Sequence, residues 1–228
     1  MWLLPTRGRP KLCQEALDAC YETGMTSDGL LIIDTRAGSY PYLHIPDNWS
    51  VIRGPLDMAD AMRIAFMLYK NDKQFGWLAD DLRPRTQNWD KLLEKEAGDW
   101  LLVHCNDLWI ANSVSDRARS LCGAFCWGGE LVRTVGWWAL PDVRQAGIDD
   151  AWIDITHPDY RKYIDEIVVE HIQHKNGKRP KDDTDNWVRD DINYINQDFR
   201  LYEQLKFGNE FEKLNKLIKE AEEDEKTE

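Results

Sequence analysis

The run Phe75-Gly76-Trp77-Leu78-Ala79-Asp80-Asp81-Leu82-Arg83-Pro84 decides the fold class that we expect for this chain. Its apolar part, Phe75–Ala79, has the length of a buried strand and delivers two adjacent carboxylates, Asp80 and Asp81, at its carboxyl end. In open α/β sheets the carboxyl ends of parallel strands form the crevice that binds ligands. Two carboxylates placed there can hold Mg²⁺ or Mn²⁺, which neutralises a diphosphate. Paired aspartates also occur in ordinary loops. The run indicates a ligand site mainly because it is one of a series of strand-like runs that each end in polar residues.

Apolar strand-like runs alternate with helical patterns along much of the chain. The expected strands are Met1–Pro5, Leu30–Asp34, Trp49–Arg53, Phe75–Ala79 and Trp100–Cys105, and a later apolar run covers Ile164–His171. Apolar residues at helical spacing predict helices over Pro10–Glu22, Asp57–Tyr69 and Trp89–Ala97. Pro10 suits a first helical turn, and Gly98 suits a C-terminal cap. This alternation predicts an α/β fold with a mainly parallel sheet flanked by helices on both faces.

The composition is that of a folded, acidic protein. With 228 residues, 43% of them hydrophobic, the chain can build one sizeable α/β domain with a helical appendage. Its net charge of −12 disfavours binding of nucleic acid by bulk charge. No stretch approaches the roughly 20 apolar residues of a membrane span, and the first residues lack the pattern of a signal peptide. The five cysteines are odd in number and mostly lie in apolar contexts, so we expect reduced thiols in a cytoplasmic protein.

The end of the chain has a different pattern. We predict an α/β domain over residues 1–183 and an extension over residues 184–228, made of two amphipathic helices and an acidic tail. The apolar stripes are Val188-Ile192-Ile195-Phe199-Tyr202 and Phe211-Leu214-Ile218-Ala221. Such stripes usually pack on their own domain, and a homodimer through the two helices is the alternative. The stretch Glu220–Glu228 holds six carboxylates and is expected to be a solvated, frayed end.

Two strand ends carry groups suited to a nucleotide. Thr6, Arg7 and Arg9 lie between the first strand and the first helix, where guanidinium groups and a helix N-terminus favour phosphate. A plain basic loop is the alternative there. Asp34 ends the second strand, and its carboxylate can accept hydrogen bonds from a base or a ribose. Taken alone, Asp34 also suits an ordinary turn.

Two later segments supply further acidic and imidazole groups. Asp149 and Asp150 follow Gly147-Ile148, where one of them could cap a helix or take a proton from an acceptor hydroxyl. His171 and His174 follow an apolar run and precede a glycine loop that ends at Lys178. A neutral imidazole could complete a metal site with the aspartates, and the lysine could meet a phosphate. A purely structural role is the alternative for these histidines.

Taken in order, these segments resemble the motifs of glycosyltransferases of the GT-A fold, in particular small family-2-like enzymes that include bacteriophage ones. Leu4–Pro10 looks like their first-strand PTRxRP element, and Ile32-Ile33-Asp34 matches their second strand. Leu78–Pro84 resembles their DxD region, Gly147–Asp150 their late G-x-E-D element, and Val169–Lys178 a late strand whose histidine can ligate a metal. The resemblance covers roughly residues 1–180. No single motif is specific, but the ordered set is.

The resemblance implies a nucleotide-sugar-dependent glycosyltransferase that uses Mn²⁺ or Mg²⁺. It assigns the metal to Asp81 and His171. It assigns the nucleotide-sugar to Thr6, Arg7, Asp34, Asp80 and Lys178. In an inverting mechanism, which we favour over a retaining one, Asp150 with Asp149 beside it would deprotonate the acceptor hydroxyl. Ala79 stands where the family often has the first Asp of its triplet, and this departure weakens the expectation that the activity depends on a metal.

The partners that follow from the resemblance are a UDP-sugar as the expected donor and an acceptor that stays open between a modified DNA base, a protein and a glycan. We expect the Trp- and Gly-rich stretch Gly123–Trp138, within an irregular segment Ser115–Trp138, to form part of the acceptor pocket. One alternative is a nucleotidyltransferase on a related scaffold, which usually carries a Gly-rich loop with a Lys after the first strand; here only Gly8 is present. The other is a non-catalytic binding protein that keeps the fold.

Overall fold

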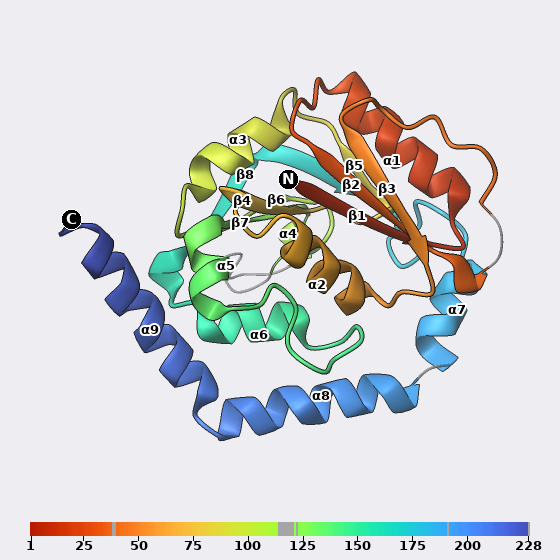
Figure 1. Cartoon of the computed structure of the whole chain (residues 1–228). Helices are drawn as coiled ribbons and strands as arrows, with labels where there is room; N and C mark the ends of the chain where they lie inside the picture. The colour runs from red at the N-terminus through yellow and green to blue at the C-terminus, as the bar shows by residue number, and fades with distance from the viewer. Residues whose placement is uncertain (38–39, 114–120, 122, 191, 228) are drawn as a thin grey trace.

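The computed structural model describes residues 1–37, 40–113, 121, 123–190 and 192–227, and for residues 113 and 187–190 it describes the backbone alone. Within these residues an eight-stranded sheet forms the centre, in the order β3-β2-β1-β4-β7-β6-β8-β5 (Figure 1). The strands are β1 Trp2–Arg7, β2 Gly29–Asp34, β3 Trp49–Gly54, β4 Gln74–Trp77, β5 Leu82–Pro84, β6 Leu102–Asn106, β7 Phe125–Gly128 and β8 Arg161–His171. Strands β3, β2, β1 and β4 are parallel neighbours, and β8 is parallel to β6. Strand β7 is antiparallel to both β4 and β6, and β5 is antiparallel to β8. The expected α/β architecture with a mostly parallel sheet is confirmed.

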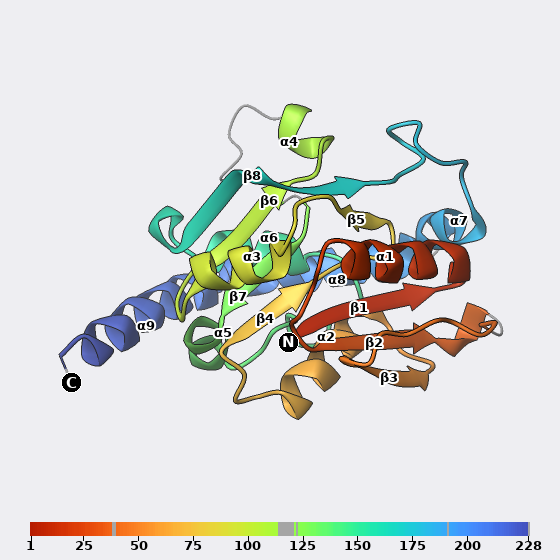
Figure 2. The ribbon, with the colours of Figure 1, turned by 90° about the horizontal axis from the view of Figure 1, so that it is seen from above.

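Helices cover both faces of this sheet. They are α1 Pro10–Glu22, α2 Met58–Leu68, α3 Trp89–Ala97, α4 Ile110–Ser113, α5 Gly129–Val135, α6 Ile148–Ile155, α7 Asp183–Asp190, α8 Ile192–Phe207 and α9 Glu210–Glu225. Seen from above, α1 and α3 lie over the strands (Figure 2), whereas α2, α5 and α6 lie below the sheet in Figure 1. The alternation along β1 produces these two layers, because Trp2 and Leu4 pack with α1 and α3, and Leu3 packs on the opposite face.

Several element boundaries agree with the sequence-based prediction. Helices α1 and α3 have the predicted limits, with Pro10 in the first turn of α1 and Gly98 as the C-terminal cap of α3 at φ 51°. The positive φ at Gly98 explains why a glycine ends that helix. None of the helices among the described residues is both long and apolar enough to cross a bilayer.

The expectation of irregular, pocket-lining chain over Ser115–Trp138 is wrong for residues 125–135, which form regular structure and do not line the cavity described below; residues 115–120 and 122 lie outside the described part. Phe125–Gly128 is a strand in the middle of the sheet, and helix α5 follows it directly. Trp127 and Trp138 are buried in the core with ring centroids 5.7 Å apart, so neither offers a free face to a sugar. The strand is only four residues long, too short for a pattern to reveal it.

The C-terminal helices pack against the domain that precedes them. Phe211 and Ile218 of α9 are buried in the same core cluster as α5 and α6. The acidic end is helical as far as Glu225, so the expectation of a frayed tail over Glu220–Glu228 is wrong for most of its length. Glu222 accepts a hydrogen bond from the Tyr160 hydroxyl at 2.8 Å, which ties the acidic helix to the body of the protein. The division at residue 183 and a homodimer through these helices stay predictions, and the Val188 side chain lies outside the description.

Gly76→Ala is expected to destabilise the sheet by about 1–3 kcal/mol, the usual range for overpacking a core. A Cβ at Gly76 would lie 2.2 Å from the buried Trp2 ring, which itself packs against Trp89 at 4.3 Å between centroids. We expect the melting temperature to fall by roughly 5 °C. Gly54→Ala is the matched control, because a Cβ there meets side-chain atoms at 3.5 Å, an ordinary contact. Equal melting temperatures for the two variants would contradict the prediction.

Candidate functional site

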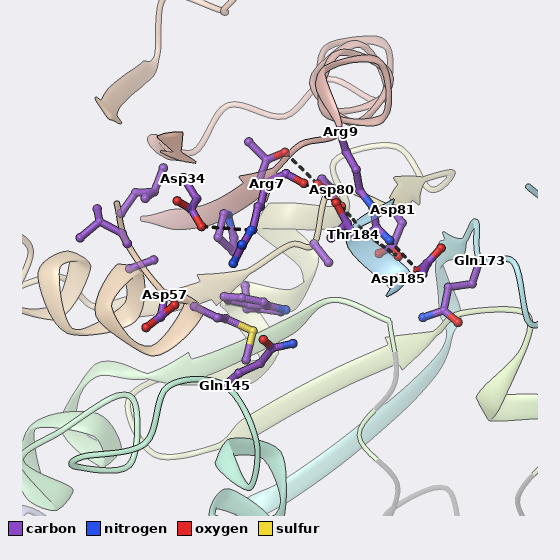
Figure 3. A pocket seen from close by; sticks show the side chains of 18 of the residues that line it. Arg7, Arg9, Asp34, Asp57, Asp80, Asp81, Gln145, Gln173, Thr184 and Asp185 are labelled. Carbon is purple, nitrogen blue, oxygen red and sulfur yellow. Dashed lines mark hydrogen bonds and ion pairs between the residues drawn. The ribbon is translucent and has the colours of Figure 1, made fainter. Parts of the chain in front are cut away.

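A cavity of about 430 Å³ opens where β1 and β2 end and β4 is followed by its two aspartates. Figure 3 shows Arg7 and Asp34 on one side of it and Asp80, Asp81 and Asp185 on the other. Because β2, β1 and β4 are parallel neighbours, the residues at their carboxyl ends meet at one edge of the sheet. Of the side chains that the sequence analysis selects, Thr6, Arg7, Asp34, Asp80, Asp81 and His171 all line this cavity.

Thr6 and Asp80 join the ends of β1 and β4. The Thr6 hydroxyl donates a hydrogen bond to Asp80 Oδ2 at 2.7 Å, and it lies 2.8 Å from the Tyr40 hydroxyl. The Tyr40 oxygen in turn accepts the backbone N–H of Arg9 at 3.1 Å. Thr6 and Asp80 are both nearly buried, so this chain of hydrogen bonds fixes the loop between β1 and α1 against the aspartate pair.

Asp81 and His171 meet because of the pairing of two short strand segments. Leu82 at the start of β5 lies opposite His171 at the end of β8, and the backbone N–H of Ile172 donates to the Asp81 carbonyl at 2.7 Å. This register places His171 Nε2 at 3.5 Å from Asp81 Oδ1. An aspartate and a histidine far apart in the sequence therefore face each other at one end of the cavity.

Burial and neighbouring charges separate the proton affinities of the two adjacent aspartates. Burial, with the charge of Asp81 added, raises the pKa of Asp80 to about 6. Burial acts in the same direction on Asp81, but His171, Arg9 and Arg179 outweigh it and hold the pKa of Asp81 below its usual range. Asp81 is therefore the member of the pair that stays ionised over the wider pH range.

His171 lies between two carboxylates. Its Nδ1 is 3.6 Å from Oδ2 of Asp107, a fully buried residue directly after β6, while Nε2 faces Asp81. Burial lowers the pKa of His171, but Asp107 and Asp81 outweigh burial and raise it to about 9. Asp107 is not among the residues selected from the sequence. The signal was present, since Asp107 follows an apolar strand in the same way that Asp80 does.

Two arginines bridge the aspartates of the cavity to the segment that leads into α7. Arg9 contacts Asp81 at 3.6 Å and donates hydrogen bonds to Asp182 at 2.9 Å and to Asp185 at 2.6 Å. Arg179 donates to Asp185 at 2.6 Å and lies 3.9 Å from Asp81. Burial lowers the pKa of Arg9, but Asp80, Asp182 and Asp81 outweigh burial and raise that pKa above its usual value, so the guanidinium remains charged. The first residues of the predicted C-terminal extension thus take part in the wall of the cavity.

The opposite wall is a second group of paired charges. Arg36 donates to Asp34 Oδ2 at 2.7 Å and to Asp57 Oδ1 at 2.6 Å, and Arg7 Nε lies 3.4 Å from Asp34. Asp34 and Asp57 are thereby held at the end of β2 and the start of α2. Both carboxylates line the cavity, where they can accept hydrogen bonds from a polar ligand.

The loop before α6 is positioned by the C-terminal extension. Asp198 of α8 is buried and accepts the backbone N–H groups of Arg144, Gln145 and Ala146 at 3.1, 2.8 and 2.9 Å. Gln145 lines the cavity. Helix α8 therefore helps to shape this side of the site, although its sequence carries none of the motifs.

Three of the residues selected from the sequence do not line the cavity. Lys178 donates to Glu170 at 2.7 Å instead, and Lys175 is the lysine in the cavity wall. The assignment of Lys178 to the nucleotide is therefore not supported, because its ammonium group forms a salt bridge with Glu170, which does not line the cavity either. Asp149 and Asp150 are exposed in the first turn of α6 and are not among the lining residues.

The pair formed by Asp81 and His171 fits a divalent cation of the Mg²⁺ or Mn²⁺ type. Ligand atoms at about 2.1 Å from such an ion lie roughly 3 Å apart when adjacent, close to the observed 3.5 Å. A carboxylate oxygen suits Mg²⁺ and Mn²⁺, whereas an imidazole nitrogen suits transition-metal ions. Among the residues that the structure describes, no three His, Cys, Asp or Glu side chains are arranged so that together they could hold a metal ion. A cation held here would draw its remaining ligands from water or from a ligand phosphate, as is usual for Mg²⁺.

Comparison with known proteins gives matches in structure alone. No protein-family model matches the chain, and no curated protein matches its sequence. A mannosyltransferase from Pyrobaculum calidifontis, solved with GDP-Man and Mn²⁺, is similar with a TM-score of 0.55 and 15% identity, over 75% of this chain and 56% of its own. Glucosyl-3-phosphoglycerate synthase from Mycobacterium tuberculosis, solved with Mn²⁺, UDP and glucosyl-3-phosphoglycerate, gives 0.54 and 14%, over 88% and 77%. TarS 1–349 from S. aureus gives 0.52 and 10%, over 74% and 58%.

These matches establish the architecture. The chain has the GT-A fold of glycosyltransferases, as its motifs imply. It spans 56% and 58% of the length of two of the three proteins just named. At identities of 10–15% the likeness extends to the fold and not to the activity.

Proposed function

We propose that this protein is a metal-dependent glycosyltransferase that moves a sugar from a nucleoside-diphosphate donor to an acceptor hydroxyl. The observation that carries the proposal is the meeting of Asp81 and His171 at one end of a cavity that Thr6 and Asp34 also line. A carboxylate and an imidazole beside a polar cavity, at the carboxyl ends of parallel strands, suit a diphosphate with its cation. Two structures of the same fold hold Mn²⁺ together with GDP-Man or UDP, which supports this donor class.

The donor would bind along the edge of the sheet. Asp81 and His171 would hold the cation, which when bound neutralises the diphosphate and stabilises the leaving group. Asp34 offers carboxylate oxygens to ribose hydroxyls or base N–H groups, and Asp80, fixed by Thr6, offers them to ribose or sugar hydroxyls. We propose a UDP-sugar as the first donor to test, and Lys175 as the lysine that meets a phosphate.

The acceptor would approach from the side of α6. Asp150, with Asp149 beside it, is the base that we propose for an inverting transfer. Both carboxylates are exposed, and neither forms an ion pair with a described residue, so a proton from an acceptor hydroxyl can reach them. Gln145, in the loop just before α6, lines the cavity and connects the two regions. A modified DNA base, a protein or a glycan stays the proposed acceptor class.

A thermal-shift panel tests the donor. UDP-, GDP-, CDP- and dTDP-sugars are added with and without Mn²⁺, and nucleoside monophosphates and triphosphates serve as comparison ligands. A ligand at 100 times its Kd stabilises the folded state by about 2.7 kcal/mol, which corresponds to a rise in melting temperature of roughly 5–10 °C at this chain length. We expect one diphosphate sugar to give this rise with Mn²⁺, and a chelator to reverse it.

The same panel, together with a hydrolysis and transfer assay on the donor that it identifies, separates the alternatives. A shift with a triphosphate that exceeds the shift with every diphosphate sugar would favour a nucleotidyltransferase. A diphosphate sugar that binds but is never hydrolysed or transferred would favour a non-catalytic binding protein. Absence of a shift with all nucleotides would contradict the proposal.

A further inference from the structure

Asp107 is fixed by the main chain immediately after β6. Its Oδ1 accepts the backbone N–H groups of Trp109 and Ala111, both at 3.0 Å. Its backbone carbonyl accepts the N–H of His171 at 3.0 Å. The residue has no exposed surface and is not part of the cavity lining, so it touches neither solvent nor a ligand in the cavity. These bonds leave the second carboxylate oxygen, Oδ2, as the part of Asp107 that is available to another group.

Oδ2 of Asp107 is directed at the imidazole of His171. It accepts no hydrogen bond from any residue that the structure describes, and it lies 3.6 Å from His171 Nδ1. A buried carboxylate oxygen without a donor is costly, so a small approach of the ring to Asp107 is favourable. The Trp109 ring lies edge-on to His171 at 5.2 Å between centroids and restricts rotation of the imidazole. The opposite nitrogen, Nε2, faces Asp81.

We propose that Asp107 is a positioning residue for the metal site: when a cation takes the place of the proton on Nε2 of His171, Asp107 keeps the other proton on Nδ1, so that Nε2 presents its lone pair to the cation beside Asp81. The inference rests on the proposed function, because it assumes that Asp81 and His171 hold a divalent cation. A neutral imidazole has one N–H and one acceptor nitrogen, and a carboxylate can only accept. Histidines that ligate metals commonly donate their other N–H to such a carboxylate. Asp107 therefore acts on the cation through His171, without touching the cation.

The test uses two variants of Asp107 and the affinity for Mn²⁺ alone, measured from the electron paramagnetic resonance signal of free Mn²⁺. In Asp107→Asn the amide oxygen can still accept from Trp109 and Ala111, while the NH₂ group faces Nδ1 and drives the proton to Nε2. Asp107→Ser keeps an acceptor for the same backbone groups but is too short to reach His171. We expect both variants to bind Mn²⁺ about 10- to 100-fold more weakly. Asp90→Asn, another buried aspartate outside the cavity, is the matched control and should bind like the wild type.

A second background separates positioning from a general structural effect. In His171→Ala, the change Asp107→Asn should cause no further loss of Mn²⁺ affinity, because the group that it orients is gone. An equal loss in both backgrounds, or wild-type affinity in the Asn and Ser variants, would overturn the proposal. A wild-type protein that binds no Mn²⁺ would overturn the metal assignment as well. Wild-type binding with unaffected Asp107 variants would remove only the role of Asp107.

Discussion

Asp81→Asn is expected to lower Mn²⁺-dependent turnover of the sugar nucleotide by roughly 100- to 1,000-fold, the size that follows loss of one transition-state-stabilising group. Asp81 is the carboxylate that His171, Arg9 and Arg179 keep ionised, so its charge is the one that a cation would meet. The Asn side chain keeps the shape but loses that charge. The effect is measured as the rate of hydrolysis of the donor that the thermal-shift panel identifies, monitored through the free sugar that is released.

The control for Asp81→Asn is Asp142→Asn. Asp142 is exposed and has φ 62°, a conformation that Asn adopts readily, so this change should leave both turnover and folding as they are. The rise in melting temperature caused by Mn²⁺ should disappear in Asp81→Asn and persist in Asp142→Asn. Unchanged turnover in Asp81→Asn would remove the metal assignment.

Asp90→Ala is expected to lower the free energy of unfolding by about 3–5 kcal/mol, because it leaves several donors without an acceptor. Asp90 is fully buried, and its Oδ2 accepts the backbone N–H groups of Thr26 and Ser27 and the Ser27 hydroxyl at 3.0, 2.9 and 2.8 Å. These bonds join the first turn of α3 to the segment that leads into β2. Denaturant unfolding gives the free energy, and the melting temperature should fall by roughly 10 °C.

Asp90→Asn tests the same explanation by removing the charge while keeping an acceptor oxygen. All three hydrogen bonds go to Oδ2, and Oδ1 accepts none from a described residue. An Asn side chain can place its amide oxygen at the Oδ2 position and keep all three bonds without the buried charge. Its free energy of unfolding should therefore stay within about 1 kcal/mol of the wild type. A large loss in Asp90→Asn as well would mean that the charge, and not the acceptor, stabilises this junction.

Local pattern predicts the elements whose own residues suffice to define them. The limits of α1 and α3 follow from apolar spacing together with Pro10 and Gly98, and the apolar run Leu30–Asp34 identifies β2 to within one residue. Strand β7 could not be found in this way. Its four residues are a strand because β4 and β6 pair on either side, and because Gly128 lets the backbone of Asp99 approach to a distance that a Cβ would block.

The residues of the candidate site also fall into those that a local pattern marks and those that only the fold brings together. A polar residue at the end of an apolar run marks Asp34, Asp80 and Asp81 in the sequence, since parallel strands bring such ends to one edge. The same rule applied after β6 would have found Asp107. The two bridging arginines, Arg9 and Arg179, are visible as basic residues, but their shared contacts with Asp185 depend on how the chain returns after β8.

The sequence by itself determined the α/β class, the order of most strands and helices, and the residue types available at the carboxyl ends of the strands. These features follow from periodicity and turn chemistry over stretches of ten or so residues. The resemblance predicted that Asp81 and His171 meet, and the register of the strands brings them together. The tertiary structure alone decided that Asp107 lies behind that imidazole and that Lys178 contacts Glu170 instead of lining the cavity. Each of these depends on the register between β5 and β8 or on the path that brings β8 beside β6, and pairing between segments distant in the chain leaves no local pattern to read.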